Sequence, residues 1–200
     1  MKRKKEKQGL QTIGIMGTER GVGATHLAIM LGNYIHAKRR ADTAILEMNQ
    51  SDALRELQRS YSVRDSPMAG EGSFHLSDVT YYYWLKKRQL GSVYSAGHEW
   101  LIIDFGACHA EAAEEFVKCD KKLVVGNVTP WNSQKMVDCI EKLIAMDCKK
   151  QICYIARFGT ESDISQIKDR YDISIYNASF EPDPFLIHGH NFGFLEGLLR

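Results

Sequence analysis

The chain has 200 residues, of which 44% are hydrophobic and 26% are charged. This length and composition suit one globular α/β domain, and they exclude a collagen, a disordered chain and a bundle of membrane-spanning helices. The formal net charge is +1, but residues 1–7 carry five basic side chains and one acidic side chain, so the rest of the chain is slightly acidic. This charge distribution argues against a globular surface built broadly for nucleic acid.

We expect residues 1–9 to form a disordered basic arm and residues 10–200 to form a single domain. No apolar segment follows the basic residues of the arm, so a secretory signal is not expected. The five cysteines are odd in number and form no Cys-x-x-Cys pair, which predicts free thiols in a reducing cytoplasm. His188 and His190 lack a third ligand at a useful spacing, so we expect no structural metal.

The first elements alternate between short apolar runs and helical patterns. Gln11–Gly17 is apolar, short and closed by glycine, which predicts a buried strand. A loop over 18–23 follows, and apolar residues then recur at three- and four-residue spacing, which predicts a helix that ends near 38–40. A second strand is predicted at 43–46, before a polar helix over 52–58.

The rest of the chain continues this alternation. We interpret 61–72 as a loop, 74–83 as an aromatic, β-rich block and 85–90 as helical. Further strands are predicted at 100–103, 123–125, Ile152–Ala156 and 173–176, and further helices around 110–117, 136–144, 164–167 and 185–199. Strands that alternate with helices in this way indicate a predominantly parallel sheet with helices on both faces, a three-layer α/β/α architecture.

Ligands of such sheets lie beyond the carboxyl ends of the strands. The informative loops are therefore those that follow Gly17, Leu46, Ile103, Val125 and Ala156.

The loop after the first strand has the sequence context of a phosphate-binding loop. Gly21 and Gly23 allow successive backbone N–H groups to point at one anion, and the helix that begins near Ala24 adds its positive dipole end. Thr25 is placed to aim its hydroxyl at a magnesium ion, and Asp104, at the end of a neighbouring strand, is placed to reach the same ion. The alternative is a tight turn that binds no ligand.

These residues resemble a known family. GVGATH, after IGIMG, resembles the deviant Walker A loop of the ParA/MinD class of P-loop ATPases, whose usual form is Lys-Gly-Gly-Val-Gly-Lys-Thr. WLIIDFG resembles the Walker B strand of that class, and Glu47-Met48-Asn49 falls where the class has Asp-x-Asp. The resemblance extends loosely over residues 11–199 and implies a P-loop NTPase-like domain. Gly-Val-Gly-x-Thr-His and IIDFG look closest to the CpaE/TadZ-like pilus-assembly branch.

The sequence departs from the family at the loop itself. The Walker lysine is replaced by Ala24, and the signature lysine, which reaches across a nucleotide-sandwiched dimer, is replaced by Glu19. Thr18 and Arg20 stand in place of the flanking glycines. Loss of one charge-assisted contact costs about 1.5–3 kcal/mol. Arg20 is our candidate for a substitute cation, because its guanidinium group suits phosphate oxygens.

The resemblance implies that ATP and magnesium are the cofactors. The predicted nucleotide-binding residues are Thr18, Glu19, Arg20, Gly21, Val22, Gly23, Ala24, Thr25 and His26. Thr25 and Asp104 are the predicted magnesium ligands, through the nucleotide, and Glu47, Asn49, Asn127 and Trp131 are further candidates. Asn49 in place of an aspartate weakens a water-activating role, and no catalytic residue is assigned.

Three functions remain open at this point. The first is a ParA/MinD-like ATP-binding protein with weak or absent hydrolysis. It acts in positioning or assembling a machine such as a pilus or secretion apparatus, as a homodimer or with protein partners of that machine. The second is a pseudo-ATPase adaptor that binds no nucleotide and works through protein contacts. The third is a DNA-associated partitioning protein that uses the basic arm.

Neither DNA nor a membrane surface is a partner that we expect for the first function. The segment FGFLEGLL carries Glu196 and has only Arg200 as a nearby cation, which favours a packed final helix over a membrane anchor. Tyr81, Tyr82, Tyr83 and Trp84 suggest base stacking, but such runs more often alternate between core and surface.

Overall fold

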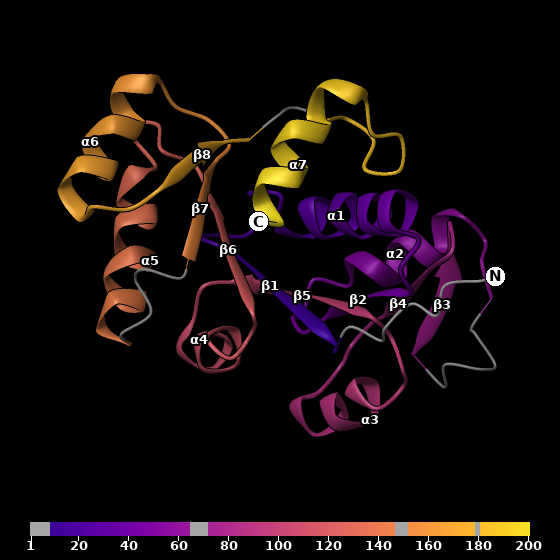
Figure 1. Cartoon of the computed structure of the whole chain (residues 1–200). Coiled ribbons are helices and arrows are strands. Elements are labelled where there is room, and N and C mark those ends of the chain that lie inside the picture. The colour runs from indigo at the N-terminus through magenta and orange to yellow at the C-terminus, as the bar shows by residue number, and fades with distance from the viewer. Residues whose placement is uncertain (1–8, 65–71, 147–151, 179–180) are drawn as a thin grey trace.

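The computed structural model describes residues 9–64, 72–146, 152–178 and 181–200, so the predicted basic arm lies almost wholly outside the described residues (Figure 1). Its strands form one eight-stranded sheet in the order β3-β4-β2-β5-β1-β6-β7-β8. The strands are β1 (Gln11–Gly17), β2 (Thr43–Glu47), β3 (Ser73–Leu76), β4 (Val79–Tyr82), β5 (Trp100–Ala107), β6 (Lys121–Gly126), β7 (Ile152–Ala156) and β8 (Ile175–Asn177). Among the strand pairs of the described residues, β3–β4 is antiparallel and the others are parallel. The predicted parallel α/β sheet is confirmed.

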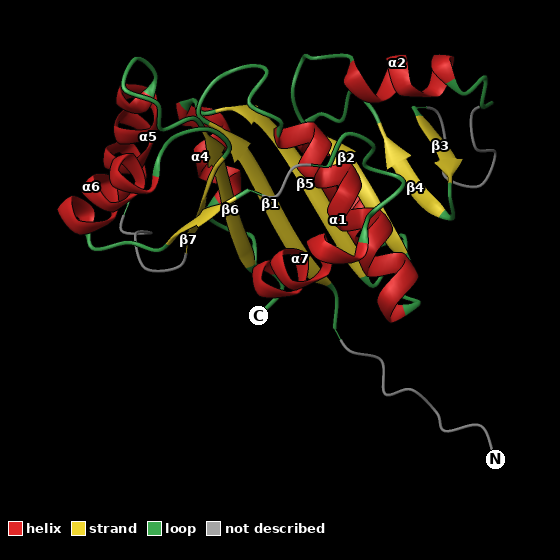
Figure 2. Ribbon diagram, turned by 90° about the horizontal axis from the view of Figure 1, so that it is seen from above, coloured by secondary structure: helices red, strands yellow, loops and turns green. Residues whose placement is uncertain are grey.

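Helices cover both faces of the sheet (Figures 1 and 2). The helices are α1 (Ala24–Arg39), α2 (Ala53–Ser60), α3 (Leu90–Tyr94), α4 (Ala110–Phe116), α5 (Ser133–Ala145), α6 (Glu161–Tyr171) and α7 (Phe192–Leu198). Residues of α1, α2 and α7 share one buried apolar cluster with the strands. Residues of α3, α4, α5 and α6 share a second cluster, on the opposite face. The three-layer architecture is therefore confirmed.

Strand β1 places the predicted phosphate loop, residues 18–26, at the centre of the sheet. It lies between β5 and β6, where Ile15 is in register with Asp104 on one side and with Leu123 on the other. Ile13 and Ile15 pack into the cluster under α1, while Met16 packs into the cluster on the other face. This alternation follows from the period of two residues in a strand, and it buries β1 on both faces.

The aromatic, β-rich block predicted over 74–83 forms a hairpin of β3 and β4. Ser77 and Asp78 both have positive φ, 51° and 60°, which is the geometry of a type I′ turn. The sequence reading missed this turn because neither residue is glycine. Of the aromatic residues, Tyr81 and Tyr82 are buried on opposite faces of the sheet, and Tyr81 stacks on Phe74 at 4.9 Å between ring centroids.

Other element boundaries differ from those predicted. Strand β5 continues past Asp104 to Ala107, because it still pairs with β1 after a bulge that shifts the register, with Ala107 opposite Gly17. The helix expected over 185–199 is only α7, because Glu181 ties His188 and Asn191 into a hydrogen-bonded turn before the helix begins. The helix expected at 85–90 is a 3-10 turn, Lys87–Gln89, followed by α3.

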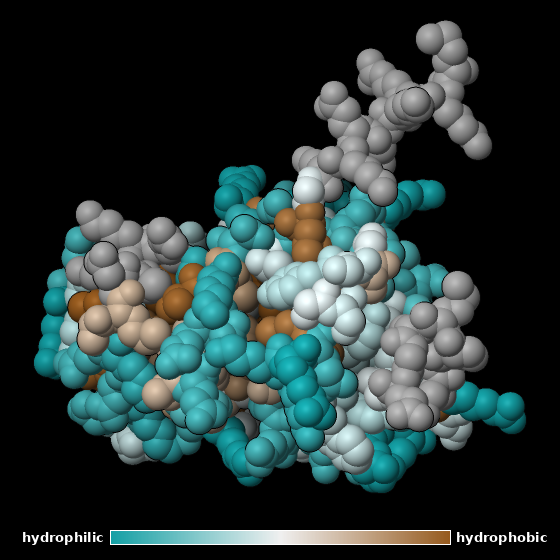
Figure 3. Space-filling model, turned by 90° about the horizontal axis from the view of Figure 1, so that it is seen from below, coloured by the Kyte–Doolittle hydropathy of each residue, from teal (hydrophilic) through white to brown (hydrophobic). Residues whose placement is uncertain are grey.

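None of the helices in the described part of the chain has the length and apolar character needed to cross a membrane. On the face of the molecule in Figure 3, hydrophilic side chains predominate among the described residues, and hydrophobic atoms appear in separate patches.

Candidate functional site

The loop between β1 and α1 has a backbone conformation that requires glycine at two positions. Gly21 has a φ of 81° and Gly23 a φ of 96°, a left-handed conformation that side-chain-bearing residues adopt at a cost. Gly23 is also the N-cap residue of α1, where no side chain caps the helix and the first turn holds no acidic residue. The positive end of the α1 dipole therefore meets no carboxylate from its own first turn.

The two predicted magnesium ligands lie in contact beside this loop. The Thr25 hydroxyl donates a hydrogen bond to Asp104 Oδ2 at 2.5 Å, and the Gly106 amide donates one to Asp104 Oδ1 at 2.9 Å. Asp104 is fully buried, and this burial raises its pKa above the ordinary value. Hydroxyl and carboxylate oxygens are the ligands that magnesium prefers, and magnesium takes the rest of its shell from phosphates and water. The donor set therefore fits the ion.

The end of β2 contributes a second buried carboxyl group. Glu47 is in register with Asp104 and is fully buried. Its Oε1 accepts hydrogen bonds from the Ser51 hydroxyl at 2.8 Å and from the Leu54 amide at 3.3 Å, while its Oε2 has no partner in the described residues. Burial raises the pKa of Glu47. The carboxyl group thus ties the start of α2 to the end of β2.

Asn49 holds the same loop in shape. Its amide nitrogen donates to the Asp104 carbonyl oxygen at 3.2 Å, and its amide oxygen accepts from the Ser51 backbone N–H at 2.8 Å. Both ends of this side chain are therefore engaged within the protein.

The charge reversal at Glu19 is balanced inside the chain. The Glu19 carboxylate is ion-paired with Lys135, in the first turns of α5. Arg20, the predicted substitute cation, is exposed and lines a wide groove next to the loop. Glu19 is therefore held by a lysine of its own chain.

Three other loop residues have structural contacts. The Thr18 amide donates to the Val125 carbonyl oxygen at 2.8 Å, which ties the loop to β6. Val22 is buried beneath the loop and packs on Gly17, where a Cβ atom would lie 2.7 Å from a Val22 methyl carbon. Ala24, which the resemblance aligns with the Walker lysine, is buried and carries no charge.

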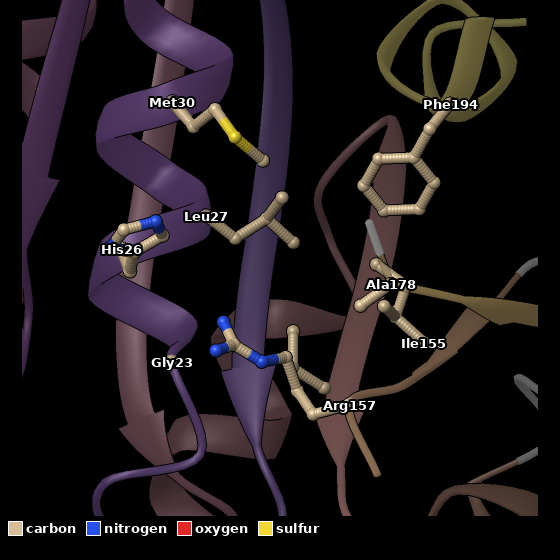
Figure 4. A pocket seen from close by; sticks show the side chains of 9 residues that line it. Gly23, His26, Leu27, Met30, Ile155, Arg157, Ala178 and Phe194 are labelled. Atoms are coloured by element: carbon tan, nitrogen blue, oxygen red, sulfur yellow. The ribbon is translucent and has the colours of Figure 1, made fainter. Parts of the chain in front are cut away.

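A cation that the sequence reading missed lies against the loop. The guanidinium group of Arg157, just after β7, packs on Gly23, where a Cβ atom would lie 2.6 Å from Arg157 Nη1 (Figure 4). His26 lines the same narrow pocket, and its pKa is lowered by burial and also by the charge of Arg157. The available signal was the position of Arg157 directly after Ala156, at the carboxyl end of a parallel strand.

A wide groove of about 1530 Å³ opens on the other side of the loop. Its walls come from the phosphate loop, the β2–α2 loop, residues 84–87 and α4. Trp84 at its rim is 44% exposed, donates its indole N–H to Asp52, and has the guanidinium carbon of Arg55 4.1 Å from its ring centroid. Of the four aromatic residues considered for base stacking, Trp84 is the most exposed.

The two remaining candidates lie after β6, away from this groove. Trp131 is 80% exposed, and the buried side-chain oxygen of Asn127 has no partner in the described residues. Neither belongs to the described residues that line the groove. Their predicted contact with a nucleotide stays a prediction.

Comparisons with known proteins place the fold. No family model matches the sequence, and no curated protein matches it. A plasmid partition protein of Borrelia burgdorferi, solved with AMPPNP, is 12% identical with a TM-score of 0.66 over 96% of this chain and 97% of that chain. The MinC:MinD cell division complex of Aquifex aeolicus gives 17% identity and a TM-score of 0.60 over 86% and 82% of the two chains. A ParA family ATPase of Chlorobium tepidum is 12% identical, with a TM-score of 0.57 over 86% of this chain and 85% of that chain. The chain has the fold of ParA/MinD-class P-loop proteins.

Proposed function

We propose that the chain binds ATP with magnesium at the loop formed by residues 18–26, and that it hydrolyses ATP slowly or not at all. The observation that carries this proposal is the Thr25–Asp104 hydrogen bond beside the uncapped start of α1. A hydroxyl and a carboxylate meet there at the positive end of a helix, next to a loop with two left-handed glycines. Oxygen ligands and backbone N–H groups at one point suit a magnesium-bound polyphosphate.

Weak hydrolysis follows from what the chain lacks at position 24. Transfer of a phosphoryl group depends on positive groups that stabilise charge in the transition state. Ala24 offers none, and Asn49 is engaged by Asp104 and Ser51 rather than free to orient a water molecule. Thr25 and Asp104 would hold the magnesium ion, which would neutralise phosphate charge when bound.

The cellular role that we propose is positioning or assembly of a larger machine, such as a pilus or secretion apparatus, with homodimers or protein partners. Its support is the resemblance of GVGATH and IIDFG to the CpaE/TadZ-like branch, together with a fold shared with partition and MinD proteins. The division into a basic arm and one domain, and a cytoplasmic location, belong to this proposal.

Isothermal titration calorimetry with ATP and magnesium tests nucleotide binding. We expect saturable binding by the wild type and a loss of at least about 10-fold in affinity for Thr25→Ala and for Asp104→Asn, since each removes an oxygen ligand or its charge. Ser92→Ala and Asp169→Asn, both exposed and absent from the lining of the groove and of the narrow pocket, are the matched controls. Thermal unfolding of each variant confirms that it is folded. Equal affinity of all five proteins would contradict the proposed site.

An adaptor without nucleotide is the second candidate, and the Glu19–Lys135 ion pair together with Ala24 favours it. In that case the wild type gives no heat with ATP. Ala24→Lys then distinguishes two causes for the absence of binding. If the variant binds ATP, the loop lacks only the positive charge of the lysine. If the variant also gives no heat of binding, the loop no longer forms a nucleotide site.

A further inference from the structure

We infer that Arg157 supplies the positive charge of the phosphate site, in place of the lysine missing at position 24. This inference rests on the proposed function, because it assigns a residue to that same site. The ligand is the phosphate chain of the nucleotide, which the guanidinium group would contact from the side of β7.

The backbone fixes where Arg157 lies. Its amide donates to the Gly126 carbonyl oxygen at 2.9 Å, which holds the start of the β7–α6 loop against the end of β6. The side chain then crosses to the start of α1 (Figure 4). A Cβ atom built on Gly23 would lie 2.6 Å from Arg157 Nη1, 3.3 Å from Cζ and 3.8 Å from Nε, so the guanidinium group packs on the glycine.

This is an unfavourable place for a cation unless an anion joins it. The start of a helix carries a partial positive charge, which repels cations and attracts anions. The first turn of α1 has no acidic residue, and the described residues form no ion pair with Arg157. Within the described part of the chain, its guanidinium carbon lies 5.9 Å from the ring centroid of Phe158, which is a long contact.

Two other basic side chains beside the loop have different surroundings. Lys135 is occupied by Glu19, and Arg20 is exposed toward the wide groove. Arg157 combines contact with the loop and absence of an acidic partner among the described residues. Its planar guanidinium group can donate two parallel hydrogen bonds to phosphate oxygens, which makes it a suitable replacement for a lysine.

Calorimetry of the full chain with ATP and magnesium tests the inference. We expect Arg157→Gln to weaken binding by about 10-fold or more, which is the loss expected for one charge-assisted contact. Arg170→Gln, which removes an exposed arginine of α6, is the matched control and should bind as the wild type does. Arg20→Gln separates the two candidate cations.

Rescue distinguishes a charge contribution from a packing role. If Arg157 acts through its charge, Ala24→Lys should recover most of the affinity in the Arg157→Gln background, so that the two changes are strongly non-additive. The unfolding temperature without nucleotide should stay the same or rise in Arg157→Gln, because a cation at a helix start is removed.

The outcomes separate the inference from the proposed function. Wild-type affinity in Arg157→Gln, a loss confined to Arg20→Gln, or a loss that Ala24→Lys does not rescue would each overturn the role of Arg157 while leaving nucleotide binding intact. Absence of binding by the wild type would overturn the proposed function itself.

Discussion

The carboxylate of Glu19 is ion-paired with the ammonium group of Lys135, 116 residues further along the chain. This pair joins the predicted phosphate loop to α5, at the position to which the sequence resemblance assigns the signature lysine. An acidic group of a partner chain would therefore find no unpaired positive charge at Glu19, because the charges of Glu19 and Lys135 compensate each other. The pair therefore sets both the local charge of the loop and its attachment to α5.

Changes to the two members of this pair should act on nucleotide affinity in opposite directions. Glu19→Gln removes a negative charge beside the loop, so we expect tighter binding of ATP, by about 2- to 5-fold. Lys135→Gln leaves Glu19 uncompensated and should weaken binding by a similar factor. Each variant should lose less than about 1 kcal/mol in the free energy of unfolding, since the lysine is well exposed. Calorimetry and urea denaturation measure both quantities, and shifts of the same sign in the two variants would contradict this account.

Glu47 should make the protein less stable as the pH rises. Its pKa is raised by burial above the ordinary value of 4.5, so the folded chain holds this proton more tightly than the unfolded chain. The contribution of Glu47 to the free energy of unfolding therefore falls as the pH rises from 4.5 through the folded-state pKa.

Glu47→Gln tests this sign. The variant keeps an acceptor oxygen for Ser51 and Leu54 and cannot ionise, so it should be more stable than the wild type at pH 8 and lose that advantage near pH 4. Urea denaturation across this pH range measures the difference, with the exposed Glu114→Gln as a control. A variant less stable than the wild type at pH 8 is the contrary result.

Glu181 should make the protein less stable as the pH falls into the acid range, which is opposite to the effect of Glu47. Its buried carboxylate accepts hydrogen bonds from the His188 amide and from the Asn191 side chain, and these lower its pKa to about 2. The folded chain then prefers the charged form, so its stabilising contribution is complete above pH 4.5 and is lost as the pH falls toward 2. Glu181→Gln places an amide N–H against these donors and should be less stable at pH 7. The deficit should shrink as the pH falls below 4, as measured by denaturation with urea. An equal deficit at every pH would show that packing alone is responsible.

Cys108 should be the most reactive of the cysteines that the structure describes. A hydrogen bond from the Cys139 thiol lowers the pKa of Cys108 below the ordinary thiol value, whereas burial raises the pKa of Cys119 and Cys153 to about 12. Because the thiolate is the nucleophile, iodoacetamide at pH 7.5 should label Cys108 first, as measured by mass spectrometry of peptides. Cys139→Ala should slow that labelling severalfold. Prior labelling of Cys153, which is also partly exposed, is the result that would sink this prediction.

The sequence was informative where local pattern and strand position decide the structure. The sequence predicts strands β1 and β5 because buried parallel strands are continuous apolar runs. Strand β1 has the predicted bounds, and β5 begins at the predicted residue but continues to Ala107. Thr25 and Asp104 were paired in advance because the carboxyl ends of parallel strands meet at one edge of the sheet.

The missed features depend on contacts between distant segments or on unusual backbone. Nothing local to Glu19 indicates Lys135, and nothing local to Arg157 indicates Gly23, because each contact is made by a long side chain from another element. The turn at Ser77 and Asp78 was missed because its left-handed conformations carry no glycine signal.

Both edge strands of the sheet, β3 and β8, are short. Strand β3 has four residues and β8 has three, so each presents few unpaired peptide groups to a neighbouring molecule. Short edge strands disfavour strand pairing between two copies of the chain, and therefore the fibrous aggregation that such pairing causes. We therefore expect any lasting association to be made by helical and loop side chains, and to leave the hydrogen-bonded ladder of the sheet unextended.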